Sequence, residues 1–189
     1  AYSSIAHMGF VTLGAFAAYQ IFQATGNVRG AAMGLDGAMV QMISHGLVSG
    51  ALFFSIGVLY DRMHSRRIAD YGGVVNTMPV FASFMVLFAM ANAGLPGTSG
   101  FVGEFLAMLD AFEAANAGAF GLNLGYAVVA GFGVVLAAVY LLYMFQQVFY
   151  GKNANPSNHR LKDLKPWEIA MVLPLLVLIF WGGLCPKTF

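Results

Sequence analysis

Five stretches of apolar residues follow one another along the chain, separated by short polar or glycine-containing connections. They run over about 1–22, 37–60, 78–114, 124–150 and 167–185. A helix needs about 20 predominantly apolar residues to cross the hydrocarbon core of a bilayer. The pattern therefore predicts an all-α, polytopic bundle of about five transmembrane helices, forming a single membrane domain over 1–189.

The third apolar stretch is too long for one straight span and carries helix-breaking residues near its centre. The sequence there reads Gly94-Leu95-Pro96-Gly97-Thr98-Ser99-Gly100. Proline removes a backbone N–H donor and clashes with the preceding turn, while glycine adds conformational freedom. We therefore expect two half-helices, with the span discontinuous at Pro96-Gly97. Such a break survives at membrane depth only where protein or a water-filled cavity surrounds it.

Composition indicates that lipid is the solvent of most of this chain. The sequence is 59% hydrophobic and 9% charged, with a mean hydropathy of +0.74, whereas soluble domains are about a quarter charged. A net charge of +1 and the lack of a basic patch argue against a nucleic-acid partner. One cysteine excludes an internal disulfide, and no Cys/His spacing fits a zinc ion or an iron–sulfur cluster.

Basic residues are concentrated in two connections, 61–77 and 151–166. These contain Arg62, Arg66 and Arg67, and Lys152, Arg160, Lys162 and Lys165. If five segments span the membrane, both connections lie on the same side, and the positive-inside rule assigns that side to the cytoplasm, or to the matrix in mitochondria. We interpret the arginines of the first connection as topology determinants.

Three ionisable residues lie inside the apolar stretches: His7, His45 and Glu104. A charged side chain at the bilayer centre costs about 2.5–3.5 kcal/mol on insertion scales, and Glu104 lies about one turn beyond the predicted break. Proton transfer needs groups that accept and release protons, and imidazole and carboxyl side chains do both. The pattern indicates a proton or ion pathway. It also allows plainer roles, with the histidines as helix–helix hydrogen-bonding residues and Glu104 as a cap of its half-helix.

Polar neighbours accompany the two histidines. Ser3 precedes His7 by one helical turn, and Gln41, His45 and Ser49 follow at i, i+4 and i+8 on one helix face. We expect Ser3, Gln41 and Ser49 to support proton transfer by holding waters.

Three further features carry expectations without a functional role. Gly46 and Gly50 form a small-xxx-small pair that favours the close approach of another helix. Asp110 and Glu113 are expected to face water at a membrane surface. The segment 23–36 is expected to be a long connection.

Four ordered motifs resemble the antiporter-like membrane subunits of proton-pumping NADH:quinone oxidoreductase, which is respiratory complex I. They are Ala1-Tyr2-Ser3-Ser4-Ile5-Ala6-His7-Met8-Gly9-Phe10, Gln41-Met42-Ile43-Ser44-His45-Gly46-Leu47, Leu59-Tyr60-Asp61-Arg62 and Leu95–Phe105. Within this family the match is to the subunit M group, called subunit 4 in mitochondria. That group carries glutamate at the position of Glu104, whereas sister subunits and related cation/proton antiporters usually carry lysine. The absence of an initiator Met and of a signal peptide agrees with the C-terminal part of a longer antiporter-like subunit.

The resemblance implies proton translocation coupled to electron transfer from NADH to quinone in other subunits. It implies that His7, His45 and Glu104 carry protons, with no cofactor or metal in this chain. NADH, FMN, iron–sulfur clusters and quinone would belong to partner subunits. The implied surroundings are other antiporter-like membrane-arm subunits, lipid and internal waters, in a bacterial plasma membrane or a mitochondrial inner membrane.

Two other functions remain open from the sequence. One is a subunit of a cation/proton antiporter, and the other is a structural membrane subunit that transports nothing. The second predicts that Glu104 and His45 tolerate substitution.

Overall fold

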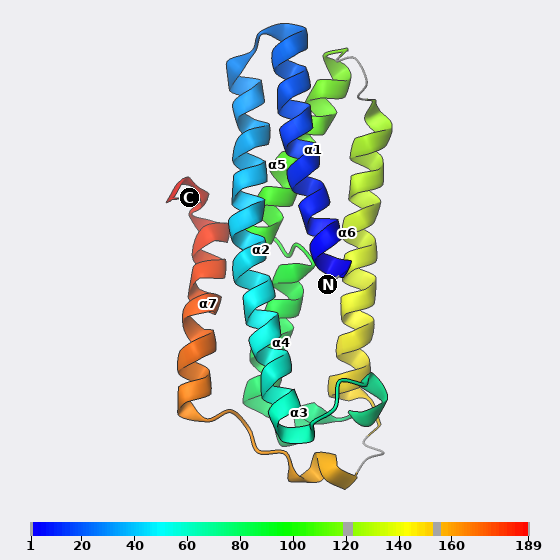
Figure 1. Ribbon diagram of the computed structural model, residues 1–189, viewed down its shortest axis with the longest axis vertical. Helices are drawn as coiled ribbons and strands as arrows, with labels where there is room; N and C mark the ends of the chain where they lie inside the picture. The colour runs from blue at the N-terminus through cyan, green and yellow to red at the C-terminus, as the bar shows by residue number, and fades with distance from the viewer. Residues whose placement is uncertain (1, 119–122, 153–155, 189) are drawn as a thin grey trace.

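The computed structural model describes residues 2–118, 123–152 and 156–188, which form helices and no strand (Figure 1). The predicted 115–123 turn and 151–166 connection lie partly outside these described residues. The α-helices are α1 (Tyr2–Thr25), α2 (Val28–Met63), α3 (Val74–Thr77), α4 (Pro79–Asn92), α5 (Ser99–Asn116), α6 (Leu124–Phe145) and α7 (Pro166–Leu184). A π-helix covers Gln146–Tyr150, and short 3₁₀ helices cover Ile68–Asp70, Pro156–Arg160 and Pro186–Thr188.

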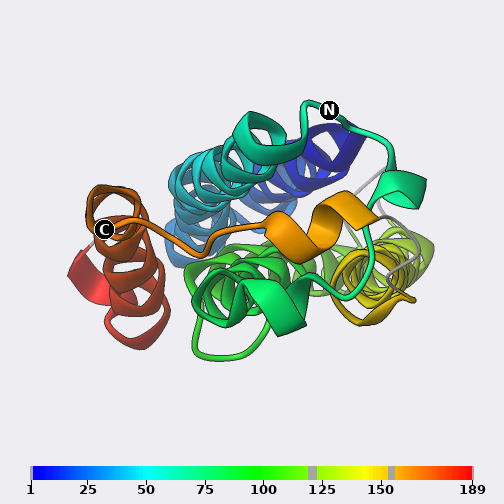
Figure 2. The same ribbon diagram turned by 90° about the horizontal axis from the view of Figure 1, so that it is seen from below.

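The prediction of an all-α bundle with about five spans is confirmed. Within the described ranges, four helices are long and apolar enough to cross a membrane: α1, α2, α6 with its π-helical continuation to Tyr150, and α7. The remaining span is divided between α4 and α5, with 93–98 unwound between them. Seen from the end that carries the basic connections, α1 and α2 form one layer and α4, α5 and α6 the other, with α7 at one edge (Figure 2).

The break in the third span is an ordered turn that the sequence encodes. Gly94 and Gly97 have φ angles of +76° and +94°, a left-handed region that favours glycine. Thr98 closes the turn, because its backbone N–H and its hydroxyl both donate to the carbonyl oxygen of Leu95, at 3.0 and 2.7 Å.

The expectation of a long connection over 23–36 was wrong. Only Gly26 and Asn27 separate α1 from α2, because Gly26 adopts a φ of +66° and Asn27 caps α2. The Asn27 side-chain oxygen accepts from the backbone N–H groups of Arg29 and Gly30. The glycine- and alanine-rich start of α2 is helical because small residues let it pack closely on its neighbours.

Glycines set how closely α1, α2 and α5 approach. A Cβ built on Gly103 of α5 would lie 2.7 Å from the backbone N and Cα of Gln41, and one on Gly37 of α2 would lie 3.0 Å from the backbone N of Ala107. Gly46 and Gly50 do not have this role within the described chain, since a Cβ on either meets no atom within 4 Å. The closely packed interface of α2 with α1 and α5, called the seam below, therefore lies on a different face of α2 from the predicted one.

We predict that Gly103→Ala destabilises the protein by about 1–3 kcal/mol, the usual cost of overpacking. The added methyl group would press on the α2 backbone, which cannot move aside as a flexible side chain can. The thermal unfolding midpoint of the purified protein in detergent measures this effect. Gly131→Ala on α6 is the matched control, because its Cβ meets nothing within 4 Å. Equal midpoints for the two variants would contradict the close seam.

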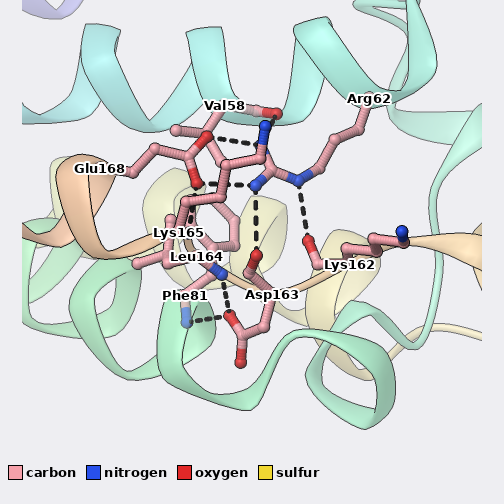
Figure 3. Close-up of polar contacts among 8 residues, drawn as sticks. All are labelled: Val58, Arg62, Phe81, Lys162, Asp163, Leu164, Lys165 and Glu168. Atoms are coloured by element: carbon pink, nitrogen blue, oxygen red, sulfur yellow. Dashed lines mark hydrogen bonds and ion pairs between the residues drawn. The ribbon is translucent and has the colours of Figure 1, made fainter.

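A hydrogen-bond network ties three helices together at the end that carries the basic connections (Figure 3). Arg62, in the last turn of α2, forms an ion pair with Glu168 in the first turn of α7, with Nη2 and Oε2 2.7 Å apart. The guanidinium also donates to the carbonyl oxygens of Val58, Lys162 and Asp163. With the two bonds to Glu168, its donations match the five N–H groups that an arginine offers.

The same network caps the half-helix α4. The Asp163 carboxylate accepts from the backbone N–H groups of Val80 and Phe81, at 2.9 and 3.0 Å. A carboxylate at a helix N-terminus pairs free N–H groups and complements the helix dipole. Arg62 therefore binds α7 directly and holds the segment that positions α4.

Candidate functional site

A buried polar network forms where α1, α2 and α5 meet. Nδ1 of His7 lies 2.8 Å from Oε1 of Glu104. Nε2 of Gln41 lies 3.3 Å from His7 Nδ1 and 3.4 Å from Glu104 Oε1. The three residues are 5%, 3% and 1% exposed, in the order His7, Glu104, Gln41. The fold thus brings together two of the three predicted proton carriers and one predicted supporting residue, from positions 34 to 97 residues apart.

The contact between His7 and Glu104 has two hydrogen-bonding arrangements. With the proton on Nδ1, the imidazole donates to the carboxylate; with the proton on Glu104, the carboxyl O–H donates to Nδ1. The heavy atoms need not move between the two, because 2.8 Å suits both bonds. The Gln41 amide N–H is placed to donate to the carboxylate in the first arrangement.

His45 adjoins this network from α2. Its ring centroid lies 5.0 Å from that of His7, with the ring planes tilted by 32°. It also lines a groove of about 630 Å³ that extends along α2 toward Tyr60 and Arg66. Within the described residues, His45 Nδ1, His7 Nε2 and Gln41 Oε1 are buried without a hydrogen-bond partner. Buried polar atoms of this kind are usually paired with water.

The other two predicted supporting residues have different partners. Ser3 Oγ accepts from Asn92 Nδ2 at 3.3 Å and from the Tyr140 hydroxyl at 2.9 Å, so it links α1 to α4 and α6. Ser49 Oγ donates to the backbone carbonyl of His45 at 2.6 Å, within its own helix. Among the described residues, Gln41 is the only one of the three that bonds to the side chain of a predicted proton carrier.

Several polar contacts near the site were not anticipated. The hydroxyls of Ser44 on α2 and Ser99 on α5 are 2.8 Å apart, and Asn92 and Tyr140 bond to Ser3. Asn92 could have been identified from the sequence, because it is a polar amide at the end of an otherwise apolar half-helix, just before the break. The break also passes beside the carboxyl group, because a Cβ on Gly94 would lie 2.8 Å from Glu104 Oε2.

The expectation that Asp110 faces water was wrong, whereas Glu113 is exposed as predicted. Asp110 is fully buried, and neither carboxyl oxygen has a hydrogen-bond partner in the part of the chain that the structure describes. The reason is helix periodicity, because Asp110 lies on a buried stripe of small residues on α5 that includes Gly103, Ala107 and Ala114.

The contacts of Glu104 also test its alternative role as a cap of its half-helix, and the positions of the ionisable side chains show whether they could bind a metal ion. Glu104 bonds to side chains of α1 and α2, and within the described ranges it makes no bond to a backbone N–H of its own half-helix. Those residues also contain no group of three or more His, Cys, Asp or Glu side chains placed to hold a metal ion.

The sequence is similar to those of known proteins. The family described as "NADH:quinone oxidoreductase/Mrp antiporter, TM" matches residues 1–124. NADH-quinone oxidoreductase subunit M of Rhodobacter capsulatus is 46% identical over 187 residues, which are 99% of this chain and 33% of that protein. NADH-ubiquinone oxidoreductase chain 4 of Arabidopsis thaliana is 41% identical over 189 residues, covering 100% of this chain and 34% of that protein.

Solved structures share the fold. A chain of respiratory complex I from Thermus thermophilus with bound NADH superposes with a TM-score of 0.79 at 30% identity, covering all of this chain and 35% of that one. A chain of an archaeal membrane-bound sulfane sulfur reductase superposes with a TM-score of 0.72 at 22% identity, covering 97% and 32%, and shows the fold alone.

The chain thus spans about a third of the length of the curated relatives it matches. Its apolar helices and the family match make it an integral membrane protein. The resemblance stated from the motifs is confirmed by relatives that carry the subunit M or chain 4 name. The chain belongs to the NADH:quinone oxidoreductase/Mrp antiporter transmembrane family.

Proposed function

We propose that this chain translocates protons in the membrane arm of an NADH:quinone oxidoreductase of the complex I type. The observation that carries the proposal is the buried 2.8 Å contact between His7 Nδ1 and Glu104 Oε1, beside a broken helix. A buried pair of groups that can share a proton suits transfer through a membrane, where isolated ionisable residues are costly. The names of the relatives support the choice of enzyme complex.

The transfer step moves one proton within the network. A proton released by protonated His45 passes through water to Nε2 of His7, which becomes an imidazolium. The N–H bond on His7 Nδ1 then breaks and an O–H bond forms on the Glu104 carboxylate, which leaves both groups neutral. Charge rearrangements in adjacent subunits would favour one arrangement or the other and so drive the step.

The remaining chemistry is proposed to lie outside this chain. NADH oxidation, FMN, the iron–sulfur clusters and quinone reduction would belong to partner subunits, and other antiporter-like subunits would flank this one. The chain would form the C-terminal section of a longer subunit in a bacterial plasma membrane or a mitochondrial inner membrane. The 61–77 and 151–166 connections would face the cytoplasm or matrix, and protons would leave on the opposite side.

The second candidate is a subunit of a cation/proton antiporter, because the matching family includes such proteins. A glutamate at position 104 and relatives at 40–46% identity named as oxidoreductase subunits favour the first candidate. Sodium-dependent transport by an assembly without an NADH-oxidising part would favour the second.

The test is Glu104→Gln in the complete assembly, reconstituted into sealed vesicles. Glutamine keeps the shape and hydrogen-bonding capacity but cannot release a proton. We expect the number of protons translocated per NADH to fall by the number that this subunit contributes. Glu113→Gln, an exposed carboxylate on the same helix, should leave the ratio unchanged. An unchanged ratio in Glu104→Gln would exclude the role of Glu104 and favour a structural subunit.

A further inference from the structure

The three helices of the His7–Gln41–Glu104 network meet a second time, nearer the end where α1 joins α2 (Figure 1). Gly14 lies seven residues after His7, Gly34 seven residues before Gln41, and Asp110 six residues after Glu104. At 1.5 Å per residue, the two levels are about 9–11 Å apart on all three helices. Asp110 is thus a second buried carboxyl group in the same three-helix seam.

The seam is shaped around the Asp110 carboxyl group. A Cβ on Gly34 would overlap Asp110 Oδ2 and would lie 2.7 Å from the carbonyl oxygen of Gly14. A Cβ on Gly14 would in turn lie 2.8 Å from the carbonyl oxygen of Gly34. The two glycines therefore leave the space that the carboxyl group fills.

Packing alone gives no reason for a carboxyl group at this point. Asp110 is 0% exposed, and both its oxygens lack a hydrogen-bond partner among the described residues. Burying a polar group without a partner is unfavourable, and the apolar residues clustered nearby on α1 and α5 are alanines with Ile21 and Leu13. The ionisable groups on the adjoining turns, Glu113, Asp36 and Arg29, are all exposed, so none of them compensates Asp110.

We propose that Asp110 is a further proton-carrying residue, located between Glu104 and the end of the bundle at which α5 finishes. This inference rests on the function proposed above. The O–H bond of Glu104 breaks, water admitted when the three helices move apart carries the proton, and an O–H bond forms on Asp110. Glu104 is left as a carboxylate and Asp110 is neutral, so charge and protons balance. Asp110 then releases the proton to water at the end of the bundle.

The first arm of the test is Asp110→Asn in the complete assembly in sealed vesicles, beside Glu104→Gln and Glu113→Gln. Asparagine has the size of aspartate and keeps the seam packed, but it cannot release a proton. We expect Asp110→Asn to lower the protons translocated per NADH as far as Glu104→Gln does, with Glu113→Gln unchanged. If Asp110→Asn pumps normally while Glu104→Gln does not, the role of Asp110 is overturned and the proposed function stands. If Glu104→Gln pumps normally, the proposed function itself fails.

The second experiment uses the wild-type assembly, so it does not depend on whether a variant folds. Infrared difference spectra between resting and NADH-reduced wild-type assembly are recorded with unlabelled and isotopically labelled aspartate. A carboxyl that is only structural gives no difference band, whereas a proton carrier gives a C=O band that moves with the label. We expect such a band, and expect it to vanish in Asp110→Asn where that variant assembles. The absence of any aspartate band would overturn the proposal.

Discussion

Replacing Arg62 by alanine is expected to destabilise the assembled protein by about 3 kcal/mol or more, the cost of breaking a buried ion pair on one side. The variant leaves the Glu168 carboxylate without its guanidinium in a setting where that side chain is only 6% exposed. It also removes three bonds to backbone carbonyls. The thermal unfolding midpoint of the purified assembly and its yield in membranes measure the loss.

Two control variants distinguish the effect of losing the ion pair on stability from the effect of losing a positive charge. Arg67→Ala removes an exposed arginine from the same connection and should change stability by no more than about 0.5 kcal/mol. The double variant Arg62→Met with Glu168→Leu leaves no unpaired charge and should recover part of the loss. An Arg62→Ala protein as stable as Arg67→Ala would mean that Arg62 only sets topology.

Replacing His7 by phenylalanine is expected to slow proton transfer through this subunit by about 10²-fold, the lower range for a positioned proton-transfer group. Phenylalanine fills the ring volume but leaves Glu104 without its partner at 2.8 Å. Single-turnover proton release by the reconstituted assembly, followed with a pH-sensitive dye, measures the rate. His64→Asn is the control, because His64 is exposed at the C-cap of α2, with a φ of 52° that asparagine tolerates. Wild-type rates in His7→Phe would remove His7 from the pathway.

The sequence predicted the features that depend on local backbone chemistry and on apolar length. Pro96 and Gly97 placed the break in the third span correctly, since a proline next to glycines that adopt positive φ angles interrupts a helix. The same reasoning missed the short turn at Gly26–Asn27, because a two-residue turn and a glycine-rich helix start resemble a loop when only apolar length is counted.

The sequence alone could not predict which side chains the polar residues contact, because these contacts depend on how each helix is rotated against its neighbours. His7 and Glu104 are 97 residues apart, and Arg62 and Glu168 are 106 apart, so spacing along one helix gives no information about either pair. Ser3 shows the limit clearly: it lies one turn from His7, yet it bonds to Asn92 and Tyr140.

Asp110 is different, because its burial was encoded locally. Gly103, Ala107, Asp110 and Ala114 follow a helical period of small residues, which is typical of a closely packed membrane seam. The charge of Asp110 indicated a position at the surface, whereas the helical spacing of the small residues around it indicated a position in the seam. Packing decided the outcome.

The exchange of a proton between Glu104 and His7 is tested most directly by redox-triggered infrared difference spectroscopy of the complete assembly. With isotopically labelled glutamate, we expect a carboxyl C=O band that shifts with the label on reduction by NADH and is absent in Glu104→Gln. Imidazole ring bands that shift with labelled histidine should change at the same time and be lost in His7→Phe. Spectra in which no glutamate carboxyl changes protonation during turnover would contradict proton transfer at Glu104.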